Sequence, residues 1–228
     1  MLRLAGKRPH HAGSASSNVR PHLADRFAVD RFVLPGLPSP LTWRIEPPEW
    51  HCSEGALTVT SGPLNDYFHD PATGKKTATA PCALLTIDEP SFVLSTHAEL
   101  NGPSTFDAAV LFVSVSEDIW AKFCLETSPQ GDPTIVSVVT RDVSDDCNSV
   151  SLASASAYLR LAKTPRTLAF HYSLDGRYWR LARYFSLGVL HSVSVGLVAQ
   201  SPLGAGSRVR FGEFAYRAGE LPDLRDGR

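Results

Sequence analysis

The sequence lacks the features that would assign it to several specialised classes of protein. No apolar run approaches the roughly 18 residues that a membrane-spanning helix needs. The formal net charge is only -1, so no overall field draws the chain to nucleic acid or to an anionic lipid surface. We therefore expect neither a nucleic acid nor a membrane as its partner.

Metal-binding and secretory signals are also missing. The four cysteines contain no Cys-x-x-Cys pair, which disfavours a structural zinc site, and we expect neither a metal nor another cofactor. There is no Asn-x-Ser/Thr site, and the first apolar run is Met1-Leu2 alone, too short for the core of a signal peptide. These absences predict reduced thiols and a cytoplasmic protein.

The two ends of the chain differ in composition from its middle. Residues 1–24 are basic, contain several serines and have no acidic residue before Asp25, which predicts a disordered tail. A mitochondrial presequence is the minor alternative, although the apolar face that such a helix needs is poor. We expect one domain over 25–217, followed by a charged, frayed tail over 218–228.

Short alternating patterns between turn signals dominate that domain. The chain has 16 Gly and 17 Pro, and no segment of about 12 residues or more shows capped helical periodicity. The expected strands are Leu57–Thr60, Ala83–Thr86, Phe92–Leu100, Ala108–Ser114, Trp120–Thr127, Thr134–Arg141, Tyr158–Ala162, Thr167–Ser173, Tyr178–Tyr184, Ser192–Ala199 and Arg208–Tyr216. This spacing predicts an all-β protein with two antiparallel sheets packed as a sandwich or jelly roll.

One predicted strand carries the chemistry that a polar ligand needs. Alternation over 120–126 places Trp120, Lys122 and Glu126 on the face opposite Ala121, Phe123 and Leu125. We expect a ligand on this face: Lys donates hydrogen bonds, Glu accepts them, and an indole can stack on a sugar ring. The remaining expected site residues are Asp66, Ser144 and Asp145 on rimming loops, with Arg160 and His171 as secondary candidates. The alternative is a solvated outer sheet with cross-strand ion pairs.

Signatures of catalysis are absent. The sequence has no Glu-x-Asp-x-x-Glu string, which places two carboxylates on one strand in sandwich glucanases, and Glu126 stands alone on its strand. Gly-x-Ser-x-Gly, His-Glu-x-x-His and the P-loop are missing too. We therefore assign no catalytic residue, while carboxylates from separate strands remain an open alternative.

Several strings occur in an order that resembles a known family. They are "DYF" (66–68), "WAKFCLE" (120–126), "VVTRDVSDD" (138–146), "FHYSLDGRYWRLARYF" (170–185), "VGLVAQSPLGAG" (195–206) and "FGEF" (211–214). They are similar to the domain-of-unknown-function family that includes the regulation-of-enolase proteins, over about residues 25–217. The resemblance implies a concanavalin-A-like lectin/glucanase fold. The chain departs from the family's Asp-Gln-Ala-Gly string, because Ala108 stands where the family has the Gln.

Three functions are consistent with these observations. The leading hypothesis is a non-catalytic module that binds a carbohydrate, a small sugar or a protein partner. The second is a hydrolase acting on a glycan or sugar, with Glu126 as one carboxylate and Asp66, Asp145 or His171 as its partner. The third is a regulatory protein that binds a metabolic enzyme, which only the family resemblance suggests. Fold alone does not choose among them, because function depends on the residues of the site.

Overall fold

The computed structural model describes residues 31–227, and the two expectations for residues 1–24 lie outside that range. These residues form seventeen strands and no helix, so no helix in this part of the chain is able to cross a membrane. All strand pairs are antiparallel. The prediction of an all-β, two-sheet antiparallel sandwich of the concanavalin-A-like kind is confirmed.

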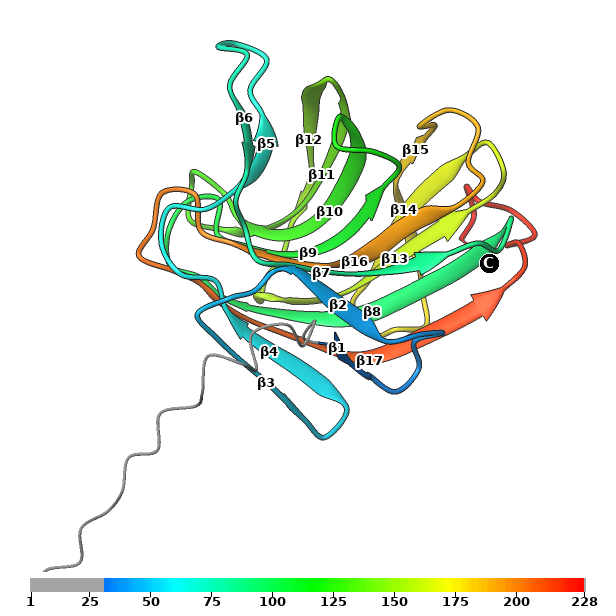
Figure 1. Cartoon of the computed structure of the whole chain (residues 1–228), viewed down its shortest axis with the longest axis horizontal. Coiled ribbons are helices and arrows are strands. Elements are labelled where there is room, and N and C mark those ends of the chain that lie inside the picture. Colours follow the sequence, from blue (N-terminus) through cyan, green and yellow to red (C-terminus); the bar gives the residue numbers. More distant parts are fainter. Residues whose placement is uncertain (1–30, 228) are drawn as a thin grey trace, which may run out of the picture.

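Two large sheets lie face to face, as Figure 1 shows. The eight-stranded sheet contains, in spatial order, β1 (Arg31–Phe32), β2 (Leu41–Ile45), β7 (Cys82–Ile87), β16 (Val193–Gln200), β9 (Ala108–Ser114), β10 (Ile119–Thr127), β11 (Pro133–Arg141) and β12 (Val143–Ser151). The seven-stranded sheet contains β15 (Arg180–Phe185), β14 (Leu168–Ser173), β13 (Ser156–Lys163), β8 (Phe92–Asn101), β17 (Arg208–Ala218), β4 (Ala56–Thr60) and β3 (Glu49–Ser53).

A small hairpin stands apart from both sheets. It consists of β5 (Tyr67–His69) and β6 (Lys76–Ala78), and in Figure 1 it rises beside the curved strands β10, β11 and β12. Polar contacts from Lys76 and His69 tie it to the end of the eight-stranded sheet. Lys76 Nζ lies 2.6 Å from carboxylate oxygens of both Asp118 and Asp142. His69 Nδ1 is hydrogen-bonded to the Asp142 carbonyl oxygen at 2.9 Å.

The main core lies between the two sheets and follows from period-2 alternation. Every second residue of the central strands points inward, as Ala121, Phe123 and Leu125 do on β10. Phe123 stacks on Phe170 of the facing sheet with ring centroids 4.8 Å apart. All eleven strands expected from the sequence are present, with bounds that differ by at most two residues.

The strands that the sequence did not predict are short or polar. Strand β12 is the clearest example, because its sequence VSDDCNSVS has no apolar alternation and most of its residues are exposed at the edge of a sheet. It forms by pairing with β11 after a tight turn in which Asp142 adopts a φ of 70°. Backbone hydrogen bonding to an existing strand therefore stabilises it rather than burial of its side chains.

The end of the chain does not fray as expected. Residues 219–227 fold back over the outer face of the seven-stranded sheet. Leu221 and Leu224 pack there against a small cluster that includes Ala162 and Ala169. Partial burial of these two leucines holds the segment in place. The sequence did not indicate this, because most residues around the two leucines are charged.

Candidate functional site

The outer face of β10 is the base of the site. In the register of the sheet, Lys122 lies beside Phe112 of β9 and Val138 of β11, and Glu126 lies beside Ala108 of β9. These side chains point away from the inter-sheet core, as the period-2 alternation predicts.

Trp120 shares this face but is not available to a ligand. The β5–β6 hairpin covers it, and its side chain is 0% exposed. Its ring lies 5.4 Å from Tyr67, 5.6 Å from Phe112 and 5.4 Å from His69, measured between centroids. Trp120 belongs to a second apolar core beneath the hairpin. The expectation that it stacks on a sugar is therefore wrong, because a tertiary contact buries it.

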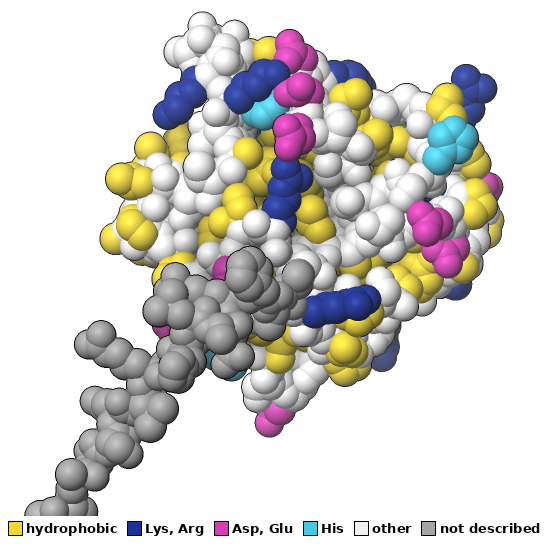
Figure 2. All heavy atoms as spheres, viewed as in Figure 1, with side chains coloured by type: hydrophobic (Ala, Val, Ile, Leu, Met, Phe, Trp, Pro, Cys, Tyr) yellow, Lys and Arg dark blue, Asp and Glu magenta, His cyan; other side chains and the backbone are white. Residues whose placement is uncertain are grey.

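A cavity of about 420 Å³ opens beside the hairpin on the same face. Its polar lining comes from four separate parts of the chain: Asp66, Asp70, Lys75 and Thr77 at the hairpin, Lys122 and Glu126, Asp146, and Gln200. Its apolar lining includes Phe68, Phe106, Val136, Val138 and Leu203. In Figure 2, acidic, basic and histidine side chains gather beside the hairpin, and hydrophobic side chains are visible in the hollow next to them.

Lys122 is the buried cation of this cavity, with 2% of its surface exposed. Its Nζ donates to Gln200 Oε1 at 3.0 Å and lies 3.4 Å from Asp66 Oδ1. The Phe68 ring centroid is 5.7 Å from the same nitrogen. An ammonium group has three donors, and residues 31–227 use two of them, so one donor is left for a ligand.

Glu126 lies beside it and is 7% exposed. Burial raises the pKa of its carboxyl from an ordinary 4.5 to about 7, against the lowering effect of Lys122; Asp66 and Asp146 add smaller upward contributions. Within residues 31–227 its carboxylate has no hydrogen-bond partner. Near neutral pH this carboxyl is therefore able either to donate or to accept a hydrogen bond.

Gln200 and Phe106 were not foreseen from the sequence. The Gln200 amide joins two parts of the site, because its oxygen accepts from Lys122 and its Nε2 donates to the Phe106 carbonyl oxygen at 3.0 Å. Phe106 adopts a φ of 69°, which is uncommon for an aromatic residue, and its ring is 38% exposed at the cavity. Gln200 is the last residue of β16, a strand that the sequence did predict. Only its pairing with Ala108 of β9 shows that its side chain is on the cavity face.

Ala108, the position at which the family resemblance implies a Gln, lies beside this site. Ala108 lies directly between Gln200 and Glu126 in one cross-strand row. A longer side chain at this position would extend between those two groups, since the three residues share one face. The methyl group of Ala108 leaves that space to the cavity.

Ser144 and Asp146 share one face of β12, and Asp145 lies on the other. Ser144 is buried and accepts from the His69 backbone N–H at 2.9 Å, so it fixes the hairpin rather than facing the cavity. Asp145 forms an ion pair with Arg183 at 3.2 Å on the other side of β12. Asp146 is the carboxylate that lines the cavity. The choice of Asp145 was therefore wrong by one position in the strand register, whereas Ser144 is on the expected face but is covered by the hairpin.

Arg160 and His171 lie in the other sheet, on β13 and β14, and are not part of this site. The segment 219–227 covers them: Arg160 Nη2 donates to the Gly227 carbonyl at 2.6 Å, and His171 Nε2 donates to the Leu224 carbonyl at 2.7 Å. Burial, followed by the nearby Arg160, lowers the pKa of His171 to about 4. Their selection was wrong because sequence alone does not fix strand order.

Of the eight expected site residues, the structure brings together Asp66, Lys122 and Glu126. Asp146, Gln200, Phe68 and Phe106 complete the cavity. Among residues 31–227, no group of three or more His, Cys, Asp or Glu side chains is arranged to hold a metal ion. The cavity therefore offers hydrogen-bonding groups, carboxyl groups and the cationic side chains of Lys75 and Lys122.

Solved structures with the same fold include proteins of quite different size. A protein from Saccharomyces cerevisiae described as functionally unknown has a TM-score of 0.74 at 22% identity, covering 79% of this chain and 97% of that one. The GH43 BlXynB protein from Bacillus licheniformis has a TM-score of 0.60 at 17% identity, covering 76% of this chain and 36% of that one. A legume lectin-like domain from Entamoeba histolytica has a TM-score of 0.52 at 11% identity, covering 78% and 90%. At these identities the likeness shows the fold alone.

Sequence comparison identifies the family. A search of the curated proteins finds no significant match. Residues 43–218 match the family described as "Protein of unknown function (DUF1349)". This match covers most of the chain and includes every residue of the cavity. The chain therefore belongs to the DUF1349 family.

Proposed function

We propose that the chain binds a small carbohydrate in the cavity beside the β5–β6 hairpin and does not cleave it. The observation that carries this proposal is the pairing of buried Lys122 and Glu126 on the floor with the rings of Phe68 and Phe106 at the sides. Sugar hydroxyls need donors and acceptors close together, and sugar C–H faces pack on aromatic rings. The cavity, at about 420 Å³, is within the usual range for small-molecule sites.

The solved neighbours support this choice in a limited way. One is described as legume lectin-like and another as a GH43 protein, so proteins with this fold are named for carbohydrate chemistry. This chain spans 36% of the GH43 protein's length, so that protein's activity is not transferred. The more specific likeness to the regulation-of-enolase proteins, which suggests an enzyme partner, stays a prediction.

A hydrolase is the second candidate, and one observation favours it. Burial raises the pKa of Glu126 to about 7, which suits a general acid, and the carboxyl groups of Asp66 and Asp146 line the same cavity. A glycosidase needs a second carboxyl group at a defined separation from the acid. Release of reducing sugar from oligosaccharides, abolished by Glu126→Gln, would identify this activity.

The binding proposal is tested with a glycan array, followed by calorimetry on each sugar that binds. Lys122→Met and Asp146→Asn should weaken binding by roughly ten- to a hundredfold, since each removes a charged hydrogen-bonding group. Asp145→Asn is the matched control, because it changes an adjacent carboxylate that faces away from the cavity. Equal weakening by Asp145→Asn and Asp146→Asn, or no binding to any glycan, would contradict the proposal.

A further inference from the structure

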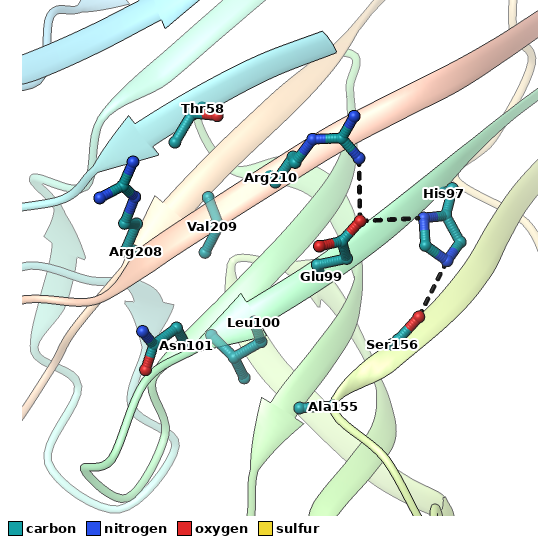
Figure 3. Close-up of a pocket in the computed structure, with 10 residues that line it drawn as sticks. All are labelled: Thr58, His97, Glu99, Leu100, Asn101, Ala155, Ser156, Arg208, Val209 and Arg210. Atoms are coloured by element: carbon teal, nitrogen blue, oxygen red, sulfur yellow. Dashed lines mark hydrogen bonds and ion pairs between the residues drawn. The ribbon is translucent and has the colours of Figure 1, made fainter.

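A second cavity, of about 560 Å³, lies on the outer face of the other sheet (Figure 3). Strand β17 contributes Arg208 and Arg210, two residues apart and therefore on the same face. In the register, Arg210 lies between Thr58 of β4 and Glu99 of β8, and Arg208 lies beside Asn101 of β8. Their core-facing neighbours Leu100 and Val209 belong to the inter-sheet core, so the arginines point to solvent.

The charges in this cavity do not balance. Arg210 Nη1 is 2.8 Å from Glu99 Oε1, and His97 Nδ1 is 3.6 Å from the same oxygen. In Figure 3 Arg210 and His97 both reach Glu99, whereas Arg208 is joined to none of the residues drawn. Among residues 31–227, Arg208 forms no ion pair. The cavity thus contains two guanidinium groups and one carboxylate, which is paired with Arg210 and not with Arg208.

Two other nearby carboxylates, those of Glu213 and Glu49, do not neutralise the positive charge of Arg208. Glu213 accepts a hydrogen bond from Tyr158 Oη at 2.7 Å and does not line the cavity. Glu49, on β3, is in the same cross-strand row as Arg208 but two strands away, about 10 Å by the usual strand spacing. At that distance an exposed pair is largely screened by salt.

The uncharged polar groups of the cavity are able to donate hydrogen bonds as well as accept them. Asn101 contributes an amide, and Thr58 and Ser156 contribute hydroxyls. Ser156 Oγ is 2.9 Å from His97 Nε2. Two guanidinium groups with an amide and hydroxyls around an open cavity are suited to oxygens that carry negative charge, which arginine binds in a bidentate manner.

We propose that this cavity binds the phosphate group of a small phosphorylated molecule between Arg208 and Arg210. Arg208 provides the unpaired guanidinium, Asn101 provides an amide donor beside it, and Arg210 turns from Glu99 to the ligand. Glu99 therefore competes with the ligand for Arg210. The site is on the sheet opposite the carbohydrate cavity, so neither proposal depends on the other.

Inorganic phosphate is the probe, titrated at constant ionic strength into the full chain labelled with nitrogen-15 and followed by NMR of backbone amide and Arg Nε signals. We expect saturable shifts confined to Arg208, Arg210 and their strand neighbours. Arg208→Gln should weaken binding at least tenfold, whereas Glu99→Gln should strengthen it several-fold by freeing Arg210. Both positions are on the surface, so the variants should fold.

Arg177→Gln is the matched control, because it alters an exposed arginine on the turn between β14 and β15. Equal weakening by the Arg177 and Arg208 variants would show that phosphate binds any surface arginine and would overturn the proposal. A parallel titration with acetate separates phosphate from carboxylate ligands. Shifts of the same size and affinity with acetate would overturn the assignment to phosphate, as would weaker binding in Glu99→Gln.

Discussion

Replacing Glu126 by glutamine should make the stability of the protein respond differently to pH. Burial raises the pKa of this carboxyl to about 7 in the folded state, whereas its ordinary value is 4.5. Between these two values the unfolded chain is ionised and the folded one is protonated, so native stability is lost as pH rises through 7. A glutamine at this position does not titrate and removes that loss.

The magnitude follows from the same two pKa values. At about 1.4 kcal/mol per pKa unit, titration of Glu126 lowers the free energy of unfolding by about 3 kcal/mol in total between low pH and pH above 7. Of this, about 2.5 kcal/mol falls between about pH 5 and about pH 8. We therefore expect the stability of Glu126→Gln relative to the native chain to increase by about 2.5 kcal/mol over that interval, which corresponds to roughly 5–10 °C in melting temperature for a chain of this size.

Urea unfolding of both proteins at the two pH values measures this difference. Other titrating groups, including His171, cancel because they are present in both proteins. Glu49→Gln is the matched control, because it makes the same change at an exposed position on β3. A change of less than about 0.5 kcal/mol for Glu126→Gln would show that its carboxyl is not desolvated and would refute the reasoning.

Three further predictions concern stability. Trp120→Ala should destabilise the fold by about 3–5 kcal/mol in urea unfolding, because it opens a cavity beneath the hairpin; a loss under about 1 kcal/mol would mean that the hairpin does not cover it. Burial lowers the pKa of His171 to about 4 from 6.5, so this histidine alone contributes a loss of about 2 kcal/mol from about pH 7 to about pH 5, and the stability of His171→Gln relative to the native chain should rise by that amount over the same interval. Gly196→Ala should cost about 1–3 kcal/mol by the same assay, since its Cβ would collide with the Ala83 carbonyl oxygen; an unchanged midpoint would contradict that close approach.

The candidate site was only partly predictable, and its individual residues show why. Lys122 and Glu126 were found because alternation along one strand fixes the face of each side chain. Asp146 was missed in favour of Asp145 because strand β12 has no apolar alternation from which to read its faces. Gln200 was missed because its part in the site comes from pairing between β16 and β9, two strands that are far apart in the sequence and adjacent only in the fold.

The sequence by itself determined the all-β class, eleven of the strands and the outward face of β10, because these depend on local periodicity and turn chemistry. The tertiary structure decided which of those outward residues a ligand is able to reach. It buried Trp120 under the hairpin, placed Arg160 and His171 in the opposite sheet, and packed residues 219–227 over them. These outcomes depend on strand order and on contacts between distant segments, and local periodicity contains no information about either.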